Sequence, residues 1–188
     1  LINDEARGVL AQLSGERLRH EIDLMFEETN ADAMLERSKE LGLLDVIHPA
    51  LLGAESRSLI ALLTEPEHEL GEFFAPDILS SKQTLGWILY LLNLSGENID
   101  AVAKRLAFPM LLTKAVRGAA ALSAELASFH GWKPSQWTFR LDEVPALAVY
   151  AVYLMKREPA LRTYLTEWRN IKPYTTVYTL QQRGLEPG

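Results

Sequence analysis

The chain has 188 residues, of which 48% are apolar, and its 11 glycines and 9 prolines are too few to indicate disorder. It has no apolar run of about 20 residues, which argues against a membrane span, and no cysteine, which excludes disulfides, thiol nucleophiles and Cys-ligated zinc. The composition fits a cytoplasmic protein of one or two domains, and the net charge of −6 argues mildly against nucleic-acid binding.

Apolar residues recur at helical spacing through the first 63 residues. Ser14 is placed to cap a helix whose apolar stripe contains Leu18, Ile22 and Phe26. The helices predicted here are a short one ending at Leu13, one after Ser14, one from Asn30 or Asp32 to Gly42, and one over residues 51–63. Residues 64–81 hold two prolines, one glycine and four glutamates, which predicts a surface loop.

The second half also shows helical patterning, without the strict alternation and hairpin turns of strands. Residues 144–155 carry no charge, so we expect them to form the central core helix. The other helices predicted here are 85–94, one capped by Ser95 or Asn98 and ending near Leu106, 109–129 after Pro109, and one from Pro159 to near Asn170. The fold class is therefore all-α, a multi-helix array of short and medium helices with no significant sheet.

Charge is distributed unevenly along the chain. Residues 1–78 carry 6 basic and 17 acidic side chains, whereas residues 79–188 carry 13 basic and 8 acidic ones. A basic half can face the phosphates of a nucleic acid. An uneven but merely solvated surface is the alternative.

The candidate RNA contacts are basic side chains of the second half, several of them beside aromatic residues that could stack on bases. Trp132 and Trp137 flank Lys133, and Trp168 precedes Arg169; the same rings could equally belong to the core. Lys114 and Arg117 are three residues apart, so they share a helix face. The candidates are Lys104, Arg105, Lys114, Arg117, Lys133, Arg157, Arg162, Arg169, Lys172 and Arg183.

Three short segments have distinctive spacing. Residues 13–21 read Leu-Ser-Gly-Glu-Arg-Leu-Arg-His-Glu, residues 41–49 read Leu-Gly-Leu-Leu-Asp-Val-Ile-His-Pro, and residues 173–188 combine prolines and glycines at the end of the chain. This pattern resembles the neck, body and start of the tail of bacterial class II tRNA nucleotidyltransferases and poly(A) polymerases. Val177 departs from the family pattern, which has glycine there. The motif positions that match are Ser14, Glu16, Arg17, Glu21, Pro173, Leu180, Gly184, Pro187 and Gly188.

The resemblance implies neck-like helices at 1–28, an RNA-binding helical body at 29–170 and the start of a truncated tail at 171–188. It also implies a parent enzyme that adds nucleotides to RNA, tRNA in particular, with ATP or CTP and Mg²⁺ bound in an N-terminal catalytic head. The neck-motif residues Ser14, Glu16, Arg17 and Glu21 would brace the helix junction beneath the nucleotide pocket. The chain has no Asp-x-Asp pair of the kind that holds two metal ions, so we expect no catalytic residues, no cofactor and no activity in this fragment alone.

No metal site is expected either, because the four histidines are isolated in the sequence and the glutamates of 64–81 lack calcium-loop spacing. The competing hypothesis for function is a helical scaffold that binds another protein, without any RNA role, through a helix groove or through the adjacent Phe73 and Phe74.

Overall fold

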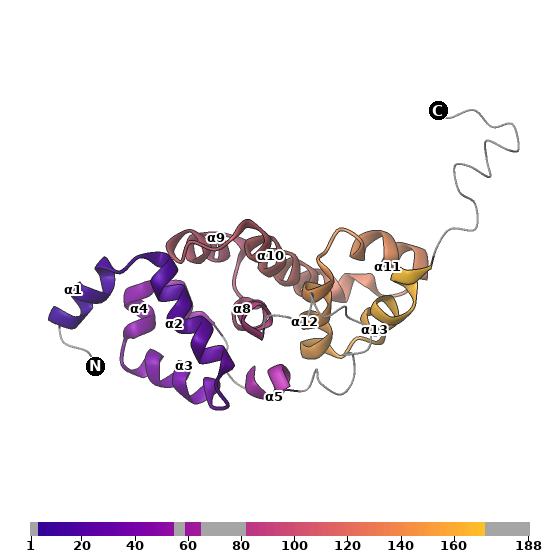
Figure 1. The fold of residues 1–188 in the computed structure, drawn as a ribbon. Coiled ribbons are helices and arrows are strands. Elements are labelled where there is room, and N and C mark those ends of the chain that lie inside the picture. Colours follow the sequence, from indigo (N-terminus) through magenta and orange to yellow (C-terminus); the bar gives the residue numbers. More distant parts are fainter. Residues whose placement is uncertain (1–3, 55–58, 65–81, 172–188) are drawn as a thin grey trace, which may run out of the picture.

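The computed structural model describes residues 4–54, 59–64 and 82–171. These ranges are helical almost throughout and contain no strand, which confirms the all-α prediction (Figure 1). The α-helices are α1 (Asp4–Gln12), α2 (Gly15–Glu27), α3 (Ala31–Glu40), α4 (Leu43–Ile47), α5 (Leu59–Thr64), α8 (Lys82–Leu91), α9 (Gly96–Arg105), α10 (Met110–Glu125), α11 (Pro134–Leu141), α12 (Ala146–Lys156) and α13 (Pro159–Thr166). Short 3-10 helices are η1 (Pro49–Gly53), η2 (Leu126–Phe129) and η3 (Trp168–Asn170).

The helices form an elongated array (Figure 1). Helices α1 to α4 pack on one another at one end, and α11 and α13 lie at the other. Helices α8, α9, α10 and α12 lie between the two groups and connect them, since α2 contacts α8, and α8 and α10 both contact α12. No helix within the described ranges has the length and apolarity needed to cross a membrane.

Helix α2 forms as its sequence predicts. The Ser14 hydroxyl accepts a hydrogen bond from the backbone N–H of Arg17 at 3.3 Å, which caps the helix start. Leu18, Ile22 and Phe26 are buried along one face, at the spacing of successive helical turns. Their burial fixes which side of α2 is left to face the second half of the chain.

The prediction of one helix over 51–63 is wrong. The chain there forms η1, leaves helical geometry at Ala54 with ψ 144°, and forms α5 after residues 55–58, which lie outside the described ranges. Pro49 starts η1, and the His48 ring accepts a hydrogen bond from the Ala50 N–H at 3.2 Å. A local cap and a proline therefore favour a short 3-10 turn over a continuous helix.

Helix α12 is a core helix, as its uncharged sequence predicts, and residues 85–91 of α8 are buried as well. All seven residues from 148 to 154 are buried, and Val149 is fully inaccessible. Helices α8, α10 and α13 surround it. The stretches predicted as single helices over 109–129 and 159–170 each end instead in a 3-10 segment, η2 and η3.

Candidate nucleic-acid interface

The segment that contains the neck-like motif is interlocked with the end of α9. A Cβ on Gly15 would lie 2.2 Å from the carbonyl oxygen of Arg105, so only glycine permits this approach. The Arg105 guanidinium donates to the Leu13 carbonyl at 3.3 Å, across the gap between α1 and α2. In the opposite direction, Arg19 donates to the carbonyls of Leu106 and Ala107. Arg105, predicted to contact RNA, therefore already holds two helix ends together.

The other motif side chains of α2 face outward. Glu16, Arg17 and Glu21 are exposed. The ion pair that this helix forms within the described ranges joins Arg19 to Asp23, with nitrogen and oxygen 3.9 Å apart. Ser14 caps the helix, as predicted. The contacts that hold α2 against the end of α9 come from other residues of the segment 13–21.

The chain turns sharply between α9 and α10. Ala107 has a φ of 49°, in the left-handed region that ordinarily suits glycine. The Phe108 N–H donates to the Ala103 carbonyl at 2.8 Å, the long bond of a Schellman ending. This turn places the Phe108 ring 4.8 Å from the Trp87 ring of α8, measured between centroids. It also sets where α10 begins relative to α2.

Two predicted cations meet in an open groove along α10. Lys114 and Arg117 are both exposed, and Arg117 makes an ion pair of 3.4 Å with Asp100 of α9. The prediction that they share a helix face is confirmed. The groove, called the α10 groove below, has a volume of about 710 Å³ and is lined by Met110, Thr113, Lys114, Arg117, Gly118, Ala121, Glu143 and Pro145.

A second hollow lies on the other side of the first turn of α10, where this turn meets α2 and α8. Asp23 accepts a hydrogen bond of 2.6 Å from the Trp87 Nε1–H there. Burial raises the pKa of the Asp23 carboxyl above its ordinary value, although the Trp87 hydrogen bond and Arg19 oppose this shift. The hollow, called the α2–α8–α10 hollow, measures about 350 Å³ and is lined by Arg19, Asp23, Gln83, Thr84, Trp87, Pro109, Leu111 and Leu112.

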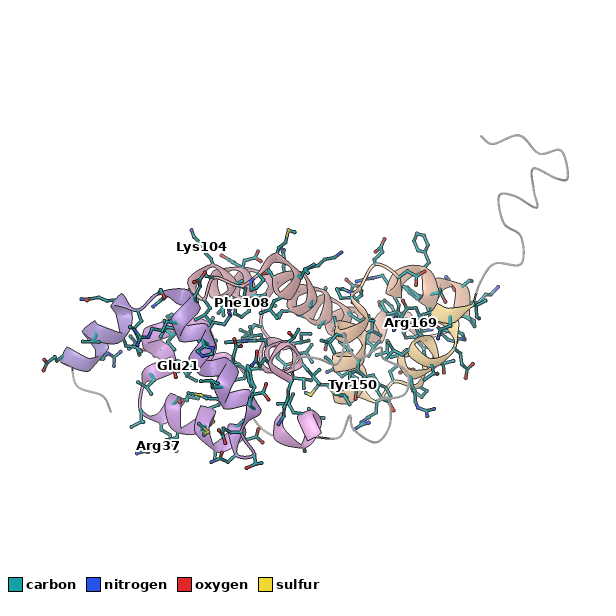
Figure 2. The ribbon with its side chains drawn as sticks, viewed as in Figure 1. Glu21, Arg37, Lys104, Phe108, Tyr150 and Arg169 are labelled. Atoms are coloured by element: carbon teal, nitrogen blue, oxygen red, sulfur yellow. The ribbon has the colours of Figure 1, made fainter. Side chains whose placement is uncertain are left out.

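The remaining predicted cations do not gather at these hollows. Figure 2 shows Lys104 near the end formed by α1 and α2, and Arg169 among the helices of the other end. Lys133, which precedes α11, and Arg162 of α13 are exposed, and Arg157 sits over the Tyr153 ring at 5.4 Å. Lys172 and Arg183 lie outside the described residues, as do the tail motif positions Pro173, Leu180, Gly184, Pro187 and Gly188.

The aromatic residues of the second half mostly serve packing. Trp132 stacks on Phe129 with centroids 4.0 Å apart, and the buried Trp137 meets the same ring edge-on. Tyr164 is buried, and its hydroxyl donates a hydrogen bond to the Asp142 carboxylate at 2.9 Å. Burial is the main cause that raises the pKa of the phenol, and the Asp142 carboxylate raises it further. The core alternative for these rings is therefore the one that the structure supports.

Within the described ranges, no three acidic or histidine side chains come together as a metal site would require. The polar groups that do converge, in the α10 groove and the α2–α8–α10 hollow, are suited to ion pairing and hydrogen bonding.

Residues 2–54 match the family model described as the probable RNA and SrmB-binding site of polymerase A. The match supports a region similar to the RNA-binding part of poly(A) polymerases and tRNA nucleotidyltransferases, which confirms the resemblance predicted from the motifs. No curated protein and no solved structure gave a significant match.

The matched segment covers α1 to η1 and therefore includes Arg19 and Asp23, which the sequence reasoning did not select. It carries 11 acidic and 5 basic residues, so it is not the part with the charge suited to phosphate. The local signal that could have selected Arg19 and Asp23 is their spacing of four residues on α2, which allows an ion pair. Their partners, Trp87 and the end of α9, come from distant sequence.

Proposed function

We propose that this chain binds RNA where α2 meets α10, with the phosphate backbone in the α10 groove. The family match supports RNA as the partner of the N-terminal segment. The cations best placed for phosphates, Lys114 and Arg117, lie on the element that adjoins it. The observation that carries the proposal is that α10, whose exposed cations line the groove, also lines the α2–α8–α10 hollow together with the matched α2.

The proposal extends to the parent protein that the motifs imply. This chain would hold RNA by its shape and backbone, and so set how far the 3′ end reaches toward a catalytic head that adds nucleotides. Transfer RNA is the proposed substrate, with Mg²⁺ and ATP or CTP acting in that head. Support comes from the family match and from the interlocked α2–α9 junction, which ties the neck-like helices rigidly to the body.

A protein-binding role is the second candidate. The family description names SrmB beside RNA, and exposed apolar residues occur away from the α10 groove, notably Phe139 at 77% and Ile171 at 70%. These two side chains line a separate hollow against α11. Binding of protein there would leave the α10 groove available for RNA.

The test is charge reversal on opposite sides of the molecule. We expect Lys114→Glu with Arg117→Glu to weaken binding of a fluorescent tRNA by about tenfold or more in low salt, because two phosphate contacts become repulsive. Arg37→Glu with Lys39→Glu makes the matched control, since both residues lie on α3 in the acidic half and line neither hollow. Figure 2 places Arg37 at the edge of the molecule opposite Lys104.

Fluorescence anisotropy measures each affinity, and circular dichroism checks that every variant retains its helices. Equal or greater loss in the control pair would place the RNA on the acidic side and refute the proposed face. Absence of salt-sensitive binding by the wild type would favour the protein-binding candidate.

A further inference from the structure

We propose that the α2–α8–α10 hollow binds one unpaired base of the RNA whose phosphates occupy the α10 groove. This inference rests on the proposed function and adds to it the chemical group that the second hollow receives. Nothing in the charge pattern of the sequence points to this place.

The size and lining of the hollow suit a single planar base. Its volume of about 350 Å³ is near the lower limit for small-molecule sites, which is about 300 Å³. Leu111, Leu112 and Pro109 supply apolar surface, while Gln83 and Thr84 supply an amide and a hydroxyl. Unstacked bases of single-stranded RNA are recognised by stacking, usually on aromatic rings, and by hydrogen bonds to their edges. In this hollow aliphatic side chains would supply the contact to the base face.

A phosphate would be a poor occupant. Asp23 places a carboxylate in the lining, and the Arg19 guanidinium beside it is engaged by the carbonyls of Leu106 and Ala107. An anion would therefore meet a negative group and a cation already hydrogen-bonded elsewhere. The α10 groove also holds a carboxylate, Glu143, but offers the exposed Lys114 in addition to Arg117. A neutral base avoids this repulsion and can donate its amino or imino hydrogens to oxygen acceptors.

The polar groups around the hollow are largely held in place. Asp23 is fixed by the Trp87 Nε1–H and by Arg19, which in turn is fixed by the end of α9. Gln83 differs, because its amide makes no hydrogen bond to another described residue and is half-exposed. An amide offers both a donor and an acceptor, so Gln83 is the group best placed to contact the edge of a base.

The first turn of α10 connects the two hollows. Met110 lines the α10 groove and Leu111 lines the α2–α8–α10 hollow, and both are largely exposed, at 82% and 76%. An RNA strand with phosphates beside Lys114 could therefore pass over the first turn of α10 and direct one base inward over Leu111. The two apolar side chains would then be covered by nucleic acid rather than left in water.

The experiment compares a 12-nucleotide single-stranded RNA with the same sequence as a duplex, each fluorescently labelled. Wild type should prefer the single strand, because pairing hides the base edges. Leu111→Ala with Gln83→Ala should weaken single-strand binding about fivefold and leave duplex binding unchanged. The control Phe139→Ala removes an equally exposed apolar side chain from a different hollow and should leave both affinities unchanged.

Lys114→Glu with Arg117→Glu should weaken both RNAs alike, because phosphates are common to them. If the Leu111 and Gln83 variant binds the single strand as the wild type does, the base site is refuted while the proposed function stands. If the wild type binds neither RNA, both are refuted together.

Discussion

Gly15 leaves no room for a side chain where α2 meets the end of α9. A Cβ added at Gly15 would lie 2.2 Å from the carbonyl oxygen of Arg105. This oxygen belongs to the backbone and cannot move aside as a flexible side chain could. We expect Gly15→Ala to destabilise the protein by about 1–3 kcal/mol, the usual cost of forcing extra volume into a packed contact. Urea denaturation monitored by circular dichroism would measure the change in unfolding free energy.

Gly8 provides the matched control for that substitution. It lies inside α1, and a Cβ added there would meet no atom within 4 Å. Gly8→Ala should therefore be neutral or stabilise by up to about 1 kcal/mol, because alanine favours the helix and restricts the unfolded chain. Similar behaviour of the two variants would show that the α2–α9 contact does not limit side-chain size.

Asp23 should make stability depend on pH. Burial raises the pKa of its carboxyl above 3.8, His20 and Arg19 lower it in part, and Glu27 adds to the rise. The folded protein therefore holds this proton more tightly than the unfolded chain does. The resulting stabilisation is complete below the unfolded pKa and is lost as pH rises through the folded pKa.

Asp23→Asn removes this titration and keeps an oxygen acceptor for the Trp87 indole N–H. We expect the melting temperature of the wild type, relative to this variant, to be highest below the unfolded pKa of 3.8 and to decline as the pH rises above it. Calorimetry of both proteins at several pH values measures the difference. A constant difference across that range would contradict the effect of burial on Asp23.

Helix α12 is the element on which the packing of the second half depends. Val149 is fully buried between α8, α10 and α13. Val149→Asp should destabilise by several kcal/mol, about 3–5, because an unpaired charge would enter the core. The exposed Ala124 of α10 serves as control, and Ala124→Asp should change stability by less than about 0.5 kcal/mol. Thermal melts that coincide for all three proteins would show that α12 is not the core.

Local patterns predicted the helices whose stabilising groups are close in sequence. The Ser14 cap, the stripe through Phe26 and the uncharged run of α12 were all confirmed. Residues 51–63 were mispredicted because the competing cap at His48 and the break at Ala54 are weaker signals than apolar periodicity. Caps and stripes act over a few residues, and this range limits what the sequence can show.

In the candidate site, contacts within one helix could be predicted from the sequence, whereas contacts between distant segments could not. The face shared by Lys114 and Arg117 followed from helical spacing alone. The α2–α8–α10 hollow did not, because Asp23 and Trp87 are 64 residues apart and meet only after folding. Arg105 looked like a free cation for the same reason, since its acceptor on Leu13 is 92 residues away.

At the scale of the whole molecule, the acidic matched segment and α10, which carries the cations of the groove, meet at the α2–α8–α10 hollow. If RNA binds along α10 as proposed, the acidic helices of the matched segment would repel a strand that strays toward them. This arrangement favours binding of RNA along α10 over nonspecific binding to the rest of the surface.

If the α10 groove binds the RNA backbone as proposed, salt dependence gives the number of phosphates that it contacts. Each phosphate contact to a single strand adds about 0.7 to the slope of log affinity against log salt concentration. Lys114→Gln with Arg117→Gln should therefore lower the slope by about 1.4 if each side chain contacts one phosphate. The decrease should be smaller for Arg117 alone, because its ion pair with Asp100 must be exchanged for the phosphate. Anisotropy titrations with a single-stranded RNA at four salt concentrations give the slopes. The control Arg37→Gln with Lys39→Gln, on α3, should leave the slope near the wild-type value. An unchanged slope in the Lys114 and Arg117 variant would mean that the backbone follows another surface.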